Sequence, residues 1–146
     1  MGKIMNEYTL SELTIGLTES FTATITTQME DAFRMISGDE NPLHKDDDFA
    51  REVSDNRFEG HVTFGMLTAS LYSRLAGMYL PGKYSLIHSF DSISFKKPVF
   101  AGDVLTVTGK ITDINEALNL IIVKATVKNQ NEKTVSDAVI KILVMK

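Results

Sequence analysis

The chain has 146 residues, a length that fits one domain, and we expect residues 1–146 to fold around a single core. The absence of cysteine excludes disulfides, thiolate metal sites, iron–sulfur clusters and cysteine nucleophiles. A formal net charge of −4 provides no cationic face for nucleic acid, and no apolar run approaches the roughly 20 residues that span a bilayer. Together with an N-terminal segment that lacks an apolar signal region, these features predict a cytoplasmic protein that binds neither nucleic acid nor membrane.

The first part of the chain predicts strand structure followed by a helix. Residues 14–26 alternate in polarity and are rich in Thr, Ile and Phe, which indicates one or two strands. Thr27 and Glu30 have the spacing of a capping box, in which each side chain accepts a hydrogen bond from the other residue's backbone amide. We therefore expect a helix that begins at Thr27 and ends near Ile36, with Gly38 in the left-handed conformation that follows a helix.

A polar loop and a short helix are expected next. Residues 37–44, with the sequence SGDENPLH, are mostly small and polar, and Pro42 keeps Asn41 out of the helical conformation, so we expect a loop. Residues 46–53 can form a short helix whose first turn holds a cluster of aspartates. These carboxylates suit the positive end of a helix, and we interpret them as a capped, solvated turn rather than as a metal site.

The second half of the chain predicts one long helix and then strands only. Between Gly65 and Tyr79, apolar residues recur at helical spacing with small residues between them, and we expect a helix that is buried nearly all round. Strands are expected after it at residues 84–95, 104–114, 118–127 and 134–144, with a hairpin turn at residues 129–132. This is an α+β pattern, and an antiparallel sheet wrapped around one long central helix is the simplest way to bury both.

The loop at residues 37–44 also carries the strongest candidate for chemistry. The sequence has no dinucleotide, P-loop, zincin or elbow-serine motif, and the spacing of His44, His61 and His88 resembles no common metal site. Asp39 and His44 lie five residues apart with a proline turn between them, so a carboxylate and an imidazole can converge on one water molecule. The alternative is that Asp39 forms a turn and His44 lies at the surface.

Three motifs occur in an order that resembles a known family. SGDENPLH, FGMLTASLYS and FKKPVFAGD follow one another within residues 35–103, as in the MaoC-like (R)-specific enoyl-CoA hydratases. The resemblance implies the hot-dog fold, in which an antiparallel sheet surrounds a long helix. It also implies that Asp39 and His44 are the catalytic pair, and that Gly65 and Ser73 match the family's glycine at the start of the helix and its serine within the helix.

Gly65 is a candidate donor to the substrate. A first-turn amide has no partner within its own helix and lies at the helix's positive end, where it can donate to a thioester oxygen. Glycine lets the substrate approach the backbone closely, although unusual dihedral angles at the start of a helix would also favour it. The family commonly has His-Gly-Met here, whereas this chain has Phe64-Gly65-Met66, so we expect altered substrate preference or rate rather than certain loss of activity.

Six positions are further candidates for contact with substrate: Asn41, Phe64, Ser73, Ala76, Lys96 and Lys97. Ser73 either polarises the catalytic pair or bonds to the backbone of its own helix. Packing around Ala76 would set the depth of an acyl tunnel. Lys96 and Lys97 either protect the end of an edge strand or contact the phosphates of coenzyme A, and we favour edge protection. His61 either leans into the space beside Phe64, where the family has its histidine, or faces solvent, and we expect it to face solvent.

The sequence therefore predicts a hydratase or dehydratase that interconverts trans-2-enoyl and (R)-3-hydroxyacyl thioesters of coenzyme A or acyl carrier protein. Water activated by Asp39 and His44 would carry the reaction without a metal or redox cofactor. Two alternatives are hydrolysis of the thioester by the same water and an acyl-CoA-binding module without turnover. The family resemblance and the frequency of two-fold assemblies also predict a homodimer or higher homo-oligomer.

Overall fold

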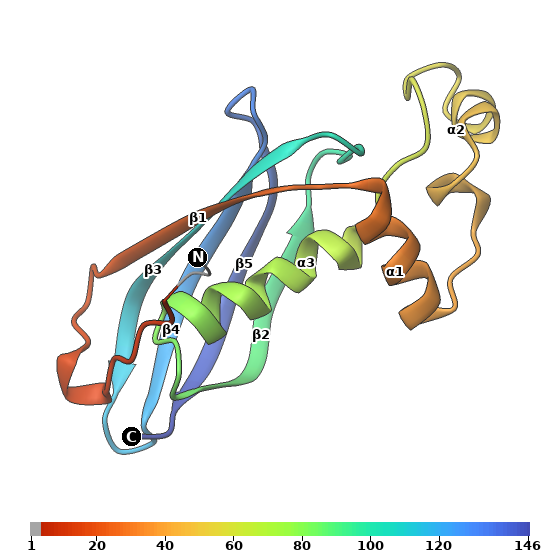
Figure 1. The fold of residues 1–146 in the computed structure, drawn as a ribbon. Helices are drawn as coiled ribbons and strands as arrows, with labels where there is room; N and C mark the ends of the chain where they lie inside the picture. The colour runs from red at the N-terminus through yellow and green to blue at the C-terminus, as the bar shows by residue number, and fades with distance from the viewer. Residues whose placement is uncertain (1–3) are drawn as a thin grey trace.

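The computed structural model describes residues 4–146 and shows one antiparallel sheet curved around a helix (Figure 1). The strands lie in the order β1-β3-β4-β5-β2. Their bounds are β1 Thr18–Thr24, β2 Ser85–Phe95, β3 Val104–Asn115, β4 Leu120–Lys128 and β5 Thr134–Val144. The expected α+β hot-dog arrangement is therefore confirmed. Residues 1–3, which belong to the N-terminal segment expected to carry no signal region, lie outside the described residues.

The strands follow from the alternation of apolar and polar residues along them. β5 occupies the predicted residues, and from Val135 onward most of its apolar side chains are buried. The expected turn joins β4 to β5, and its closing hydrogen bond runs from the Asn129 amide to the Lys133 carbonyl at 2.9 Å. The region predicted to form one or two strands contains the single strand β1, which pairs with β3 along its whole length.

The predicted long helix consists of α3 (Gly65–Arg74) and a π-helical turn, η3 (Leu75–Tyr79). Its buried side chains are Leu67, Thr68, Ala69, Leu71, Tyr72, Leu75, Ala76 and Tyr79. The expectation that this helix is buried nearly all round is wrong for the single chain, because Met66, Ser70 and Ser73 form an exposed stripe at helical spacing. A sheet that curves around one side of a helix covers only that side.

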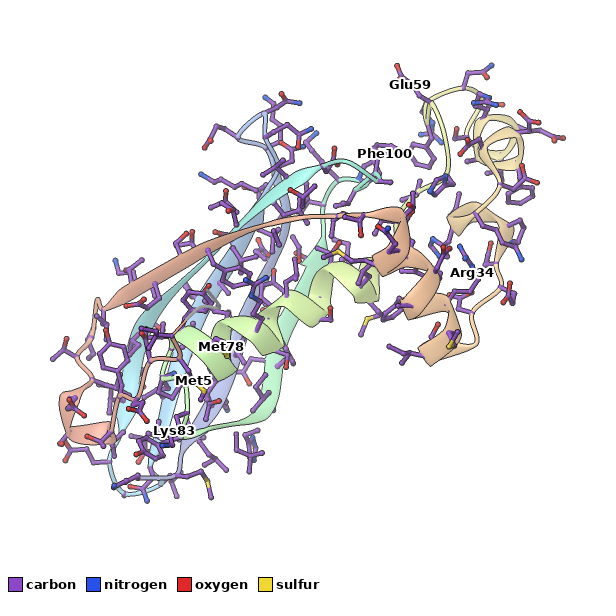
Figure 2. The ribbon with its side chains drawn as sticks, viewed as in Figure 1. Met5, Arg34, Glu59, Met78, Lys83 and Phe100 are labelled. Atoms are coloured by element: carbon purple, nitrogen blue, oxygen red, sulfur yellow. The ribbon has the colours of Figure 1, made fainter. Side chains whose placement is uncertain are left out.

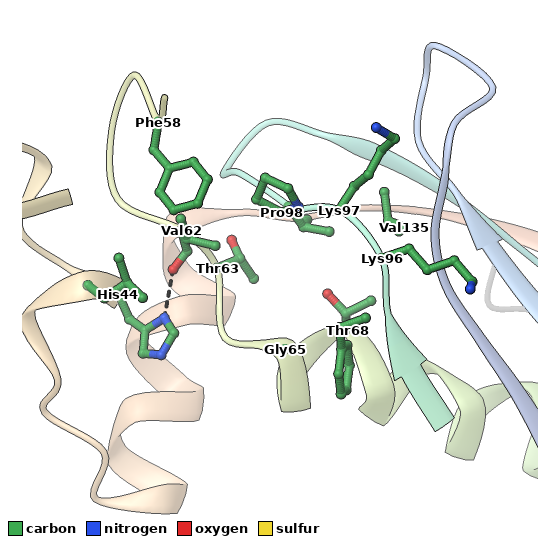
Figure 3. A pocket seen from close by; sticks show the side chains of 13 residues that line it. His44, Phe58, Val62, Thr63, Gly65, Thr68, Lys96, Lys97, Pro98 and Val135 are labelled. Atoms are coloured by element: carbon green, nitrogen blue, oxygen red, sulfur yellow. Dashed lines mark hydrogen bonds between the residues drawn. The ribbon is translucent and has the colours of Figure 1, made fainter. Parts of the chain in front are cut away.

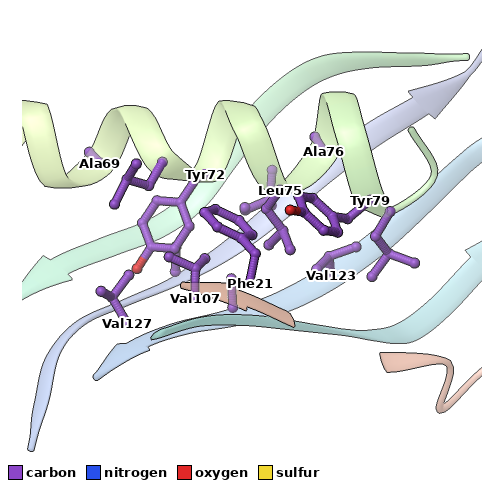
Figure 4. Close-up of a cluster of buried hydrophobic side chains, with 14 of the residues drawn as sticks. Phe21, Ala69, Tyr72, Leu75, Ala76, Tyr79, Val107, Val123 and Val127 are labelled. Carbon is purple, nitrogen blue, oxygen red and sulfur yellow. The ribbon is translucent and has the colours of Figure 1, made fainter. Parts of the chain in front are cut away.

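The core lies between this helix and the sheet (Figure 4). The ring of Phe21, from β1, stacks on that of Tyr79 with their centroids 4.8 Å apart. Tyr72 is fully buried, and its hydroxyl is satisfied by the Ser136 hydroxyl at 2.8 Å. Burial raises the pKa of Tyr72 to about 12, so this pair is uncharged at neutral pH.

The remaining helices gather at the end of the sheet where α3 begins (Figure 1). They are α1 (Thr27–Ser37), the 3₁₀ turn η2 (Pro42–His44) and α2 (Asp47–Val53). Arg34 lies in this helical end, whereas Met5 and Lys83 lie at the opposite end of the molecule (Figure 2). A further 3₁₀ turn, η1 (Leu10–Glu12), also lies toward that opposite end.

The starts of α1 and α2 show which side chains cap them. α1 begins at Thr27 as predicted, but its cap is Thr26, whose hydroxyl accepts the Met29 amide at 3.1 Å. The predicted capping box is therefore wrong, and Glu30 is buried with partners outside the helix. Gly38 ends α1 in the left-handed region at φ 71°, as expected. The interpretation of the aspartate cluster as a capped turn is confirmed by the side chain of Asp46, which caps α2.

Replacement of Gly109 by alanine is expected to destabilise the fold by about 1–3 kcal/mol, because it overpacks the contact between η3 and the sheet. A Cβ at Gly109 would lie 2.7 Å from Cδ2 of the buried Leu75 and 3.1 Å from Cγ1 of Val123. Urea unfolding measures the change. The matched control is Gly77→Ala, where a Cβ meets nothing within 4 Å and helix propensity favours alanine by about 0.5–1 kcal/mol. Equal destabilisation by both variants would contradict this account of the packing.

Candidate active site

Asp39 and His44 occupy the loop between α1 and α2, and local hydrogen bonds set its path. The Asp39 carboxylate accepts the Asn41 amide at 3.0 Å, and the Asn41 side chain accepts the Leu43 amide at 2.9 Å. These two turns bring the side chains of Asp39 and His44 together. The distance from His44 Nε2 to Asp39 Oδ2 is 3.9 Å, too long for a direct hydrogen bond and short enough for one water to contact both atoms.

A hydrogen bond at Nδ1 orients the imidazole of His44. Its Nδ1 lies 2.8 Å from the Val62 carbonyl, which can only accept, so Nδ1 carries a proton. In the neutral ring Nε2 is then the acceptor, and Nε2 is the nitrogen paired with Asp39. The Val62 amide donates to the Leu43 carbonyl at 2.9 Å, so Val62 bonds twice to the loop that carries His44. Arg34 also donates to the His44 carbonyl, at 3.3 Å.

Gly65 begins α3 next to this loop. Phe64 provides no side-chain cap, and no hydrogen bond within residues 4–146 uses the Gly65 amide. First-turn amides of this kind carry the positive end of the helix dipole. Gly65 does not have a positive φ, so unusual dihedral angles do not explain the glycine. A Cβ would lie 3.4 Å from the Phe95 ring, where it would fit but would fill space beside the amide.

Two cavities share His44, Gly65 and Phe95. The larger has a volume of about 400 Å³ and lies between the start of α3 and the segment that follows β2 (Figure 3). Its lining is mainly apolar and includes Leu43, Phe58, Val62, Pro98, Val99 and Val135. The smaller cavity, of about 260 Å³, is also lined by Asp39. The candidate catalytic groups therefore lie where two cavities have walls in common, and Asp39 lines only the smaller one.

Phe64 supports the His44 ring. It is 2 % exposed, and its ring centroid lies 4.3 Å from that of His44 and 5.0 Å from that of Phe33. The guanidinium of Arg34 lies 5.8 Å from the same ring. Phe64 thus packs against the imidazole and lines the smaller cavity, while the Gly65 amide remains without an acceptor.

The other predicted contact residues divide into two groups. Lys96 and Lys97 line the larger cavity. Asn41, Ser73 and Ala76 line neither of these two cavities. Asn41 acts through its cap of η2, and Ala76 is buried in the core. Ser73 is exposed and its hydroxyl makes no hydrogen bond within the described part of the chain, so neither interpretation of its role is supported.

The prediction that His61 faces solvent is wrong, because its imidazole bridges two carboxylates. Nδ1 lies 2.6 Å from Asp47 Oδ1, and Nε2 lies 3.0 Å from Oε1 of Glu30, whose side chain is 3 % exposed. Only an imidazolium donates from both nitrogens. Burial lowers the pKa of His61, but hydrogen bonds to Glu30 and Asp47 outweigh burial and raise it overall. The hydrogen bonds from His61 lower the pKa of Asp47.

This network also holds the segment around Val62, next to the candidate site. The Thr63 hydroxyl donates to Glu30 Oε2 at 2.7 Å, so the residues on both sides of Val62 are tied to the same buried carboxylate. Val62 is the residue whose carbonyl orients His44. The sequence analysis did not predict this network. Glu30 was a usable signal, because it lies three residues before Phe33 and therefore on the same side of the helix as that apolar residue.

Comparison with known proteins places the chain in a family. Residues 14–133 match the model of the MaoC like domain, and the chain belongs to that family. It is 47% identical over 85 residues to an (R)-specific enoyl-CoA hydratase of Aeromonas caviae, covering 58% of this chain and 60% of that protein. It is 33% identical over 109 residues to a mitochondrial 3-hydroxyacyl-[acyl-carrier-protein] dehydratase of Arabidopsis thaliana, covering 73% of this chain and 62% of that one. These matches thus span about three fifths of each relative.

Solved structures agree with this assignment. An unliganded R-hydratase of Pseudomonas aeruginosa superposes with a TM-score of 0.88 and 27% identity, covering 99% of this chain and 90% of that chain. An (R)-hydratase of A. caviae involved in PHA biosynthesis superposes with a TM-score of 0.83 and 32% identity, covering 90% of this chain and 97% of that chain.

Among residues 4–146, no three His, Asp or Glu side chains are grouped so that they could hold a metal ion. In the same part of the chain, no helix has the length and apolar character needed to cross a bilayer.

Substitution of His61 by glutamine is expected to lower the free energy of unfolding by about 2–3 kcal/mol near pH 6, because it leaves the buried Glu30 without a positive partner. Since the folded-state pKa of His61 is raised, the stabilisation is fully present below the ordinary value of 6.5 and is lost as pH rises through the folded value. The difference between wild type and variant should therefore shrink at alkaline pH.

Urea unfolding between pH 5 and 9 measures this difference. His88→Gln is the matched control, because His88 is exposed and, among residues 4–146, its imidazole bonds only to the neighbouring Ser89 hydroxyl. A difference between wild type and His61→Gln that does not change with pH would contradict a charged His61.

Proposed function

We propose that this protein adds water to trans-2-enoyl thioesters to form (R)-3-hydroxyacyl thioesters, and that it catalyses the reverse dehydration. The observation that carries the proposal is the 3.9 Å separation of Asp39 Oδ2 and His44 Nε2, close to the unpaired Gly65 amide. One substrate can then contact a water held by the pair and a donor to its carbonyl oxygen. The names of the hydratase and dehydratase relatives support the same reaction.

The proposed reaction begins at the water between Asp39 and His44. Its oxygen forms a bond to C3 of the enoyl group, and its proton passes to the pair. The electrons of the C2–C3 double bond move into the thioester carbonyl and produce an enolate. The pair then delivers a proton to C2, which regenerates the carbonyl and returns the pair to its starting state. Because both groups lie within reach of the same water, they serve together as its base.

The enolate oxygen is the group that needs stabilisation. The Gly65 amide is unpaired and lies at the positive end of α3, so it can donate to that oxygen as negative charge develops. Loss of one such donor costs roughly 3–4 kcal/mol of transition-state stabilisation.

The larger cavity supports binding of an acyl thioester. Its apolar lining suits a hydrocarbon chain next to Gly65. Lys96 directly follows the edge strand β2, and its Nζ lies 3.6 Å from the carboxylate of Asp137. This position agrees with edge protection. Lys97 has no ion pair among residues 4–146, so it is the better candidate for a phosphate. Coenzyme A and the prosthetic group of acyl carrier protein both carry a phosphate group.

Two further points belong to the proposal. Addition of water to an enoyl thioester transfers protons and changes no oxidation state, so the proposed reaction needs no redox cofactor, and Asp39 and His44 supply the base without a metal ion. The proposed location is the cytoplasm, which a chain without cysteine suits.

Asp39→Asn and His44→Ala are each expected to lower kcat for crotonyl-CoA hydration by about 10²- to 10⁴-fold, because each removes part of the base that activates water. Loss of enoyl absorbance measures the reaction, and His88→Ala is a control outside both cavities. Release of free thiol at the rate of substrate loss would instead identify a thioesterase. Binding of crotonyl-CoA without turnover by the wild type would identify an acyl-CoA-binding module.

We further propose that the protein forms a homodimer through β2. β2 is the last strand of the sheet and has one unpaired edge. Large apolar side chains on it are exposed, namely Leu86, Phe90, Ile93 and Phe95. Phe95 adjoins Gly65, so this surface continues onto the exposed stripe of α3 at Met66, Ser70 and Ser73. A free edge beside a continuous apolar surface is suited to a second copy related by a two-fold axis.

Ile93→Lys is expected to convert the dimer to a monomer, because it places a charge in the centre of the proposed interface. Sedimentation equilibrium measures the mass. Leu118→Lys is the control, because Leu118 is equally apolar, is 62% exposed and lies in the turn between β3 and β4. A wild type that sediments as a monomer, or an Ile93→Lys variant that remains a dimer, would refute the proposed interface.

A further inference from the structure

Thr68 has a buried hydroxyl without a hydrogen-bond partner. It lies one turn into α3 and is 2 % exposed, and it lines the larger cavity together with Gly65 and His44. Among the described residues, its Oγ1 is one of two buried side-chain polar atoms that have no partner, and the other is Nε of Arg34. A buried hydroxyl without a partner is destabilising, so its presence in a cavity wall requires an explanation.

The helix itself does not satisfy this hydroxyl. A helical threonine commonly donates to the carbonyl three or four residues earlier. Four residues before Thr68, the Phe64 carbonyl already accepts two amides, from Leu67 at 3.1 Å and from Thr68 itself at 3.3 Å. The hydroxyl projects from the helix toward the space lined by Pro98 and Lys97 (Figure 3).

The position of Thr68 places its hydroxyl near the Gly65 amide. Residues three apart lie on the same face of a helix, and side chains lean toward the helix's N-terminus. Thr68 therefore covers the first turn, where Gly65 has no side chain. The other hydroxyl that lines this cavity, that of Thr63, is engaged because it donates to Glu30 at 2.7 Å.

We propose that the Thr68 hydroxyl is a second hydrogen-bond donor to the thioester carbonyl oxygen of the substrate, beside the Gly65 amide. This inference rests on the proposed function. The hydroxyl donates to the carbonyl in the bound substrate and more strongly to the enolate oxygen, on which negative charge develops. No bond to Thr68 forms or breaks, and its proton stays on the hydroxyl. Thr68 is thus a catalytic residue that contacts the reacting carbonyl.

Thr68→Val preserves the shape of the side chain and removes the donor, whereas Thr68→Ser keeps the hydroxyl. The valine variant should lose about 100-fold in kcat with little change in KM, because the interaction is strongest in the transition state. The serine variant should retain most of the activity. The valine variant should melt at the same temperature as the wild type or higher, since it removes an unsatisfied buried group. Thr126→Val, half-buried on β4 and outside the cavity, is the control.

A binding measurement isolates the carbonyl oxygen without turnover. Butyryl-CoA carries the thioester carbonyl, and S-butyl-CoA has a methylene in its place. By titration calorimetry, Thr68→Val should bind butyryl-CoA roughly 3- to 10-fold more weakly than the wild type and should bind S-butyl-CoA equally well. Thr126→Val should match the wild type with both ligands.

The results separate this inference from the proposed function. Equal weakening of both ligands by Thr68→Val would assign the contact to the acyl chain and overturn the proposal. Unchanged kcat and unchanged affinity for butyryl-CoA would also overturn it. If the wild type does not hydrate crotonyl-CoA, the proposed function fails, and the comparison of the two ligands still decides whether Thr68 donates to a carbonyl oxygen.

Discussion

The candidate site depends on the hydrogen bonding of Val62 to the loop that carries Asp39 and His44. Its amide donates to Leu43, and its carbonyl accepts from His44 Nδ1. These two bonds join the loop after α1 to the segment that leads into α3. They also select the tautomer of His44, so that Nε2 is the nitrogen available toward Asp39. Without them, the imidazole and the Gly65 amide would be held in place only by the packing of Phe64 on His44 and by the network around Glu30.

A charged network next to the larger cavity also maintains this relation. Glu30 and His61 are both removed from most solvent, and such charges are tolerated only when each has a partner. His61 satisfies carboxylates from two different helices at once, which ties α1 and α2 to the segment before α3. The position of Val62 is therefore a consequence of buried electrostatics as well as of backbone hydrogen bonds.

Local patterns predicted most of the fold, whereas the family resemblance singled out Asp39 and His44 as the candidate catalytic pair. β5 was predicted to the residue, because its alternation is regular and turns bound it. Local spacing indicated only that Asp39 and His44 can converge, because the turns that join them lie within six residues, and it left a surface imidazole as an open alternative. The contact between Glu30 and His61 spans 31 residues, and no local pattern encodes such a pairing. Thr68 is likewise an ordinary helical residue in sequence, and only the cavity shows that its hydroxyl has no partner.

Phe95 belongs both to the proposed dimer interface and to the lining of the candidate site. It is the last residue of β2, one of the two edge strands, and its ring also lines both cavities beside Gly65. Any partner that pairs with β2 would therefore constrain a side chain that shapes the substrate's surroundings. Natural selection would then act on quaternary assembly and on the fit of the acyl group together, because a change at this side chain would alter both.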